Sequence, residues 1–159
     1  SGRDPATGTE LLRSRASYFI RGAGGFGIPG PKQVWERPER EPERKLLVHV
    51  RDDQALLYRL SGDRNPLHSD PAFAARAGFP RPILHGLCSY GIVGRLLLGA
   101  YCDGEPGRFR MLDCRSTAPA YPGDRLSVEI WEGDGEHRFI VRRNGEEVVL
   151  DRGVFGFVN

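Results

Sequence analysis

Residues 86–100, GLCSYGIVGRLLLGA, contain a single charged residue, Arg95. A helix built from this stretch is apolar nearly all round, which predicts a central helix wrapped by other parts of the protein. Gly91 and Gly94 each cost about 1 kcal/mol in helix propensity. Close approach of the helix backbone to a neighbour would justify glycine at these two positions.

The chain after this helix has the composition of β-strands separated by turns. The predicted strands are residues 107–118, 124–131, 137–143 and 146–158. Asn144-Gly145, between the last two, is typical of a two-residue hairpin turn and therefore of antiparallel pairing.

The chain before the helix predicts shorter elements. Residues 46–50 form a candidate strand. Asp52 or Asp53 can cap a short helix that ends near Gly62, and Asp70 can cap a second short helix. Taken together, the order of elements predicts an α+β fold in which an antiparallel sheet curls around the central helix.

The N-terminal part differs in composition from the rest. Residues 10–21 alternate with a period near two and predict a strand. Residues 36–45, ERPEREPERK, are charged and proline-rich, which is typical of a semi-rigid surface linker. We therefore expect a terminal segment over residues 1–23, a linker over 24–45 and one compact domain over 46–159.

The overall composition is that of an ordinary globular domain. The chain has 159 residues, and 23 Lys and Arg against 21 Asp and Glu leave a net charge of +2. This balance gives no electrostatic reason to expect nucleic acid or an anionic membrane as a partner. Three cysteines without a CxxC pair favour a reducing, cytoplasmic setting. Because the chain does not begin with Met, we expect a processed chain or a piece of something longer.

The groups able to carry out chemistry lie in residues 58–86. A turn places Asp63 in a loop, with Asn65 two residues later and His68 five residues later. A carboxylate and an imidazole on one rigid loop can hold a water between them. Because histidine titrates near neutrality, the pair can move a proton in both directions at pH 7. Asn65 could fix the ring or the loop by a side-chain hydrogen bond.

Gly86 opens the predicted central helix. The first N–H groups of a helix have no partner within the helix, and the helix dipole is positive there. Without a Cβ, glycine lets a ligand approach the backbone closely. An enolate oxygen that develops on a thioester would be stabilised at this position.

This stretch resembles the hydratase 2 motif of the MaoC-like (R)-specific enoyl-CoA hydratases, a long pattern with fixed spacing. The resemblance is carried by Tyr58, Ser61-Gly62-Asp63, Asn65-Pro66-Leu67-His68, Asp70-Pro71, Ala74, Gly78-Phe79 and Pro82-Ile83-Leu84-His85-Gly86-Leu87. It implies a hot-dog fold and reversible hydration of trans-2-enoyl-CoA to (3R)-3-hydroxyacyl-CoA in fatty acid metabolism, for example β-oxidation. It implies no metal or redox cofactor, and coenzyme A only as part of the substrate.

The resemblance also implies roles for particular residues. Asp63 and His68 would be the catalytic pair, Asn65 would support them, and Gly86 would supply the N–H that stabilises the enolate.

Four neighbours are candidate substrate contacts: Ser61, Gly62, Phe79 and His85. His85 can instead be a structural histidine bonded to the backbone, and Phe79 a packing residue. A metal site built from His49, His68, His85 and Cys88 is conceivable, but its spacing matches no known zinc pattern.

Some members of this family look like two hot-dog repeats in one chain, of which the first has lost the motif. Residues 9–27 look like the end of such a first repeat, so we expect this chain to be the second half. Its expected partner is the first repeat or a homologous chain, in a dimer or another homo- or hetero-oligomer. Arginines of the linker could reach a phosphate of coenzyme A. The alternatives left open are a hot-dog acyl-CoA thioesterase and a non-catalytic acyl-CoA-binding half of a heteromeric hydratase.

Overall fold

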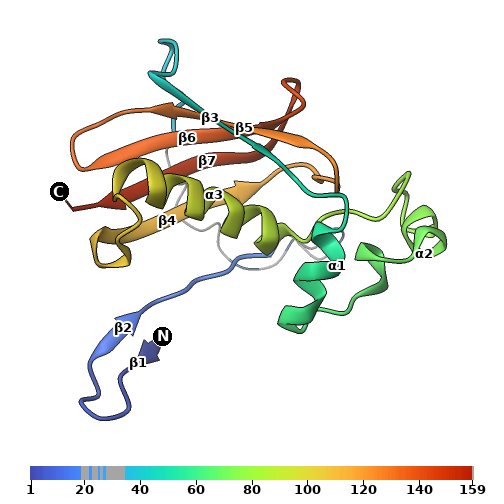
Figure 1. Ribbon diagram of the computed structural model, residues 1–159, viewed down its shortest axis with the longest axis horizontal. Helices are drawn as coiled ribbons and strands as arrows, with labels where there is room; N and C mark the ends of the chain where they lie inside the picture. Colours follow the sequence, from blue (N-terminus) through green and yellow to red (C-terminus); the bar gives the residue numbers. More distant parts are fainter. Residues whose placement is uncertain (19–21, 23–24, 26, 28–34, 159) are drawn as a thin grey trace. The chain divides into compact units, whose positions relative to one another are not determined.

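The computed structural model describes residues 1–18, 22, 25, 27 and 35–158 (Figure 1), and the chain divides into two compact units, Ser1–Val34 and Trp35–Asn159. In the first unit, β1 (Gly2–Arg3) pairs antiparallel with β2 (Glu10–Leu12). The strand predicted over residues 10–21 is wrong beyond Leu12, because residues 13–18 have no regular structure. β1 has only two residues to offer as a partner, and no sheet face in this unit buries the alternating side chains. Residues 19–21 lie outside the described part.

The second unit contains a five-stranded antiparallel sheet with the order β3-β5-β6-β7-β4. Its strands are β3 (Arg44–His49), β4 (Phe109–Ser116), β5 (Arg125–Trp131), β6 (Glu136–Arg143) and β7 (Glu147–Phe157). All five predicted strands of this unit are confirmed, with ends that shift by a few residues. β3 and β4 are the two edges of the sheet.

The long helix α3 (Gly86–Tyr101) lies against one face of this sheet (Figure 1). Val93 and Leu97 are fully buried and belong to the same core cluster as Phe139 and Phe155 of the sheet. The predicted α+β class is confirmed. No helix among the described residues is long and apolar enough to cross a membrane.

One expectation about α3 is wrong within this chain. Its outer side is open: Gly91 and Arg95 are exposed, and Leu87 keeps 71% of its surface accessible. One sheet covers only one side of a helix, and no other described element of the second unit wraps the opposite side. A Cβ on Gly94 would lie 3.1 Å from Leu112 Cδ2, which agrees with the predicted close approach. A Cβ on Gly91 would meet nothing within 4 Å.

Two short helices, α1 (Gln54–Tyr58) and α2 (Pro71–Arg76), lie beyond the N-terminal end of α3 (Figure 1). The Asp70 carboxylate accepts hydrogen bonds from the N–H groups of Ala72 and Phe73 at 2.8 and 3.2 Å, as the predicted cap requires. Asp53 occupies the N-cap of α1 without capping it, because its carboxylate pairs with Arg51 instead.

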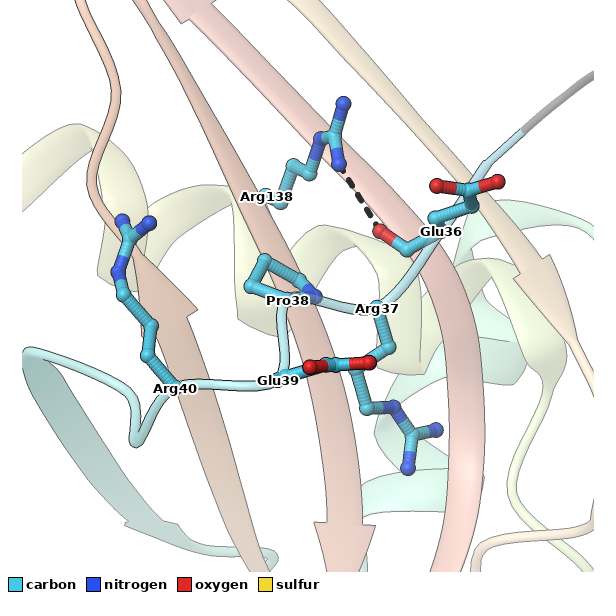
Figure 2. Close-up of a pocket in the computed structure, with 6 residues that line it drawn as sticks. All are labelled: Glu36, Arg37, Pro38, Glu39, Arg40 and Arg138. Atoms are coloured by element: carbon cyan, nitrogen blue, oxygen red, sulfur yellow. Dashed lines mark hydrogen bonds between the residues drawn. The ribbon is translucent and has the colours of Figure 1, made fainter.

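Residues 35–43, called the strap here, cross the face of the sheet opposite α3 (Figure 2). Trp131 Nε1 donates to Arg40 O at 2.7 Å, and Arg138 donates to Glu36 O at 2.9 Å. This part of the predicted linker therefore folds with the sheet. An open cleft of about 570 Å³ lies here, lined by Glu36, Arg37, Pro38, Glu39, Arg40 and Arg138. Arg37 pairs with Asp151 and Arg40 with Glu43, so both strap arginines engage carboxylates.

Gly153 in β7 is packed so tightly that a side chain cannot be added. A Cβ there would lie 2.5 Å from the Phe139 ring and 2.5 Å from the Phe139 carbonyl oxygen. Because backbone cannot yield as a flexible side chain does, we expect Gly153→Ala to lower the free energy of unfolding by about 3 kcal/mol. Urea denaturation measures this. Gly107→Ala is the control, since a Cβ on Gly107 meets nothing within 4 Å. Equal stability of the two variants would contradict the packing described.

Candidate active site

Asp63 and Asn65 are held by hydrogen bonds within one loop. The loop joins two turns of 3₁₀ helix, η1 (Arg59–Ser61) and η2 (Pro66–His68). Gly62 bends the chain after η1 with φ = +111°, a conformation that glycine adopts readily. The Asp63 carboxylate accepts from the Asn65 N–H at 3.1 Å, and the Asn65 side-chain oxygen accepts from the Leu67 N–H at 3.0 Å. Asn65 therefore orders the loop rather than the imidazole ring.

His68 is fixed in a single orientation at the end of this loop. It is 8% exposed, and its Nδ1 lies 2.9 Å from the carbonyl oxygen of Ile83. A carbonyl only accepts, so Nδ1 carries the proton and Nε2 keeps a free lone pair. One carboxylate oxygen of Asp63 and one ring nitrogen each of His68 and His85 all lie within 4.8 Å of one another. That separation suits a water that bridges the Asp63 carboxylate and the His68 ring.

His85 lies directly behind His68. The two rings stack with centroids 3.7 Å apart and an interplanar angle of 24°. His85 is 2% exposed, and its Nε2 donates to the carbonyl oxygen of Asp63 at 3.2 Å. The ring thus connects the start of α3 to the Asp63 loop and supports the His68 ring, as a structural histidine bonded to the backbone would.

The surroundings of His85 keep it neutral. Burial lowers the pKa of His85, and the nearby His68 and Arg59 lower it further. With Nε2 donating to Asp63 O, Nδ1 is an acceptor, and it has no hydrogen-bond partner among the described residues. A neutral His85 ring therefore adds no positive charge beside His68 and Asp63.

Gly86 is the first residue of α3, and His85 is its N-cap. The His85 side chain makes no capping hydrogen bond, because it is turned toward Asp63. The Gly86 N–H donates to no acceptor among the described residues. It is therefore available to an anionic or partly anionic oxygen at the positive end of the helix dipole.

A pocket of about 320 Å³ begins at Gly86. It is lined by Phe79, Ile83, Leu84, Gly86, Ser89, Ser116, Thr117, Ala118, Pro119, Ala120, Val149 and Leu150. Its wall includes Ile83, whose carbonyl holds His68, so the pocket adjoins the Asp63–His68 pair. A mostly apolar cavity with a few polar groups at one end is typical of a site for a small organic ligand.

The predicted substrate contacts are distributed unevenly around this pocket. Phe79 lies on its wall, whereas Ser61 and Gly62 lie in the exposed part of the Asp63 loop and His85 lies behind His68. Sequence reasoning missed two hydroxyl side chains of the pocket, Ser89 and Ser116. Ser89 follows Gly86 by three residues, so helical periodicity could have placed both on one side of α3. Ser116 comes from β4 and carries no signal in the sequence.

Among the described residues, the one group of histidine, cysteine and acidic side chains close enough to share a metal ion is Asp63, His68 and His85. It differs from the conceivable set that included His49 and Cys88. His68 presents the right nitrogen for a metal, but His85 uses Nε2 to hold the Asp63 carbonyl.

Similar proteins were found by sequence and by structure. The profile of the family described as "MaoC like domain" matches residues 33–151. The chain is 43% identical to 3-hydroxyacyl-thioester dehydratase Y of Mycobacterium tuberculosis, covering 99% of this chain and 57% of that protein. It is 47% identical to enoyl-CoA hydratase ChsH3 of the same organism, covering 79% of this chain and 44% of that protein.

Solved structures agree in fold. A MaoC-like dehydratase from Phytophthora capsici superposes with a TM-score of 0.82 at 36% identity, covering 88% of this chain and 51% of that one. The R-hydratase PhaJ1 from Pseudomonas aeruginosa superposes with a TM-score of 0.60 at 26% identity, covering 74% of this chain and 79% of that one.

The fold is that of a hot-dog domain, and the loop that carries Asp63 and His68 lies next to the start of its long helix. The chain belongs to the MaoC-like domain family, and the predicted hot-dog fold is confirmed. The chain spans about half the length of the curated relatives that it matches.

Proposed function

We propose that this chain catalyses the reversible hydration of trans-2-enoyl-CoA to (3R)-3-hydroxyacyl-CoA. The observation that carries the proposal is that Asp63 and His68 lie close together. A carboxylate oxygen of Asp63 and a ring nitrogen of His68 lie within 4.8 Å of each other, beside the pocket that Gly86 lines. One relative is named a hydratase and another a dehydratase, which are names for the forward and the reverse direction of this reaction, and both names support the proposal. The (3R) configuration follows from the motif and from the relative named R-hydratase.

The reaction is an addition of water across the C2=C3 bond. Asp63 and His68 hold the water between them, and one of the pair takes a proton from it as the oxygen bonds to C3. The π electrons of the double bond move onto the thioester oxygen and form an enolate. One of the pair then delivers a proton to C2, on the same face as the added oxygen. All atoms of the water end in the product, so the pair is regenerated.

The enolate oxygen is stabilised by the Gly86 N–H. This donor is fixed by the helix before the reaction begins, so no reorganisation is needed when charge develops. A side chain at this position would narrow the approach, since Ser116 Oγ lies 3.7 Å from where a Cβ on Gly86 would be. The coenzyme A portion of the substrate supplies binding energy that positions the alkene.

Because the thioester itself accepts the electrons, the proposed reaction needs no metal or redox cofactor. We therefore expect EDTA to leave the hydration rate of the chain within about 20% of the untreated rate, even though Asp63, His68 and His85 lie close enough to share an ion. The rate before and after chelation and gel filtration measures this. Loss of activity that added Zn²⁺ restores would contradict it.

We propose that the partner of this chain is a second hot-dog unit, either an adjoining repeat or another chain. The exposed side of α3, with Leu87 71% accessible, and the edge strand β3 offer surfaces that such a unit would cover. The double length of the matched relatives supports the same proposal. We also propose a cytoplasmic location, which the three unpaired cysteines support.

The function is tested by incubating the chain with trans-2-butenoyl-CoA and following two signals together. The enoyl-thioester absorbance reports loss of the double bond, and a thiol reagent reports free coenzyme A. We expect the absorbance to fall without release of thiol. Stoichiometric thiol release would identify a thioesterase instead. Binding of the substrate with neither change would identify a non-catalytic half.

A further inference from the structure

Two serine hydroxyls of the pocket next to Gly86 are not used by the fold. Ser89 lies on α3 and Ser116 is the last residue of β4. Both line the pocket, and neither hydroxyl makes a hydrogen bond with another described residue. Their neighbour Thr117 differs, because its hydroxyl donates to the carbonyl oxygen of Val148 at 2.7 Å. Two free donors therefore face a cavity whose other walls are mainly apolar.

Ser116 is the closer of the two to the Gly86 backbone. Its Oγ lies 3.7 Å from the position of a Cβ built on Gly86, and no other atom outside the start of α3 lies within 4 Å of that point. Since a Cα–Cβ bond is about 1.5 Å long, Ser116 Oγ is no more than about 5 Å from the Gly86 Cα. An oxygen atom bound in this part of the pocket can accept two hydrogen bonds at once, one from the Gly86 N–H and one from the Ser116 hydroxyl.

We propose that the Ser116 hydroxyl is a second donor to the thioester oxygen, on the opposite side of that oxygen from the Gly86 N–H. This inference rests on the proposed function and adds a side chain to its machinery. Ser116 belongs to β4 and Gly86 to α3, so the two donors are fixed by different elements and meet across the pocket mouth. The Ser116 proton stays on its oxygen throughout.

The hydroxyl acts on the step at which charge develops. A neutral thioester carbonyl accepts a weaker hydrogen bond than an enolate oxygen does, so a second donor stabilises the enolate more than the bound substrate. Removing one donor of such a pair typically lowers kcat by about 100-fold or more. Because the remaining Gly86 N–H still binds the carbonyl, we expect KM to change little.

Ser116→Ala is the variant that tests the proposal. Ser116 is exposed at the end of a strand, so its replacement leaves the core unchanged. For hydration of trans-2-butenoyl-CoA we expect kcat to fall by about 100-fold, with KM and the Kd for butanoyl-CoA within threefold of the unaltered chain. Ser116→Thr keeps the hydroxyl on a residue suited to a strand and retains at least about a third of kcat.

Ser127→Ala is the matched control, since Ser127 lies on β5 and does not line the pocket. We expect it to leave kcat unchanged. An active unaltered chain whose Ser116→Ala variant keeps kcat within twofold would overturn the role of Ser116 alone. An unaltered chain that does not hydrate the substrate would overturn the proposed function, and the role of Ser116 with it.

Discussion

Asp63→Asn lowers kcat for hydration by about 1000-fold, because the carboxamide cannot accept the proton of the attacking water. The change is nearly isosteric, and the amide oxygen can still accept the hydrogen bond from the Asn65 N–H that shapes the loop. His85 holds Asp63 through its backbone carbonyl, which the substitution leaves in place. The loop should therefore keep its geometry while losing its base. Steady-state kinetics with trans-2-butenoyl-CoA measures the effect.

Asp134→Asn is the control for this variant, since Asp134 is exposed in the turn between β5 and β6. It should leave kcat unchanged. Equal thermal unfolding midpoints for both variants would show that the loss at Asp63 is chemical rather than structural. An Asp63→Asn chain that keeps a tenth or more of kcat would contradict the role given to the carboxylate.

His68→Asn is the second large effect, with an expected fall in kcat of about 100- to 1000-fold. The asparagine amide nitrogen reaches nearly the position of Nδ1, so it can still donate to the Ile83 carbonyl oxygen. What the variant loses is the Nε2 lone pair, which the proposed mechanism uses to accept or deliver a proton. His49→Asn is its control, because His49 is exposed at the end of β3.

Combining the two active-site changes tests whether Asp63 and His68 act as a unit. The effects on kcat of residues that share one step are strongly non-additive. The double variant should therefore have about the same kcat as the more impaired of the two single variants. Effects that multiply would show that the two residues act in separate steps, contrary to a shared water.

The fold was predictable where local chemistry decides the structure. The central helix was expected from its apolar run and begins at the predicted Gly86. Asp70 caps α2 because the local geometry of a cap is set by a few residues. The predicted strand over residues 10–21 is wrong over residues 13–18 for the opposite reason, since alternation becomes a strand only when a partner strand and a buried face exist.

The sequence predicted the site residues that follow one another closely in the chain, but not the contacts between separate elements. Asp63, Asn65, His68 and Gly86 are visible as a spaced pattern, and the structure brings the first three into one hydrogen-bonded loop beside α3. The stacking of His85 on His68 depends on how the segment folds back, which the spacing does not contain. Ser116 lies near Gly86 because the fold places the end of β4 next to the start of α3. The residues around Ser116 in the sequence do not indicate this.

The shared role of Asp63 and His68 is tested most directly by the stereochemistry of the product formed in D₂O from trans-2-butenoyl-CoA. Asp63 and His68 lie on one loop and would deliver both the oxygen and the proton from that side. We therefore expect (3R)-3-hydroxybutanoyl-CoA with deuterium at C2 on the same face as the new hydroxyl. A (3S) product, or deuterium on the opposite face, would contradict a single acid–base pair acting from one side of the alkene.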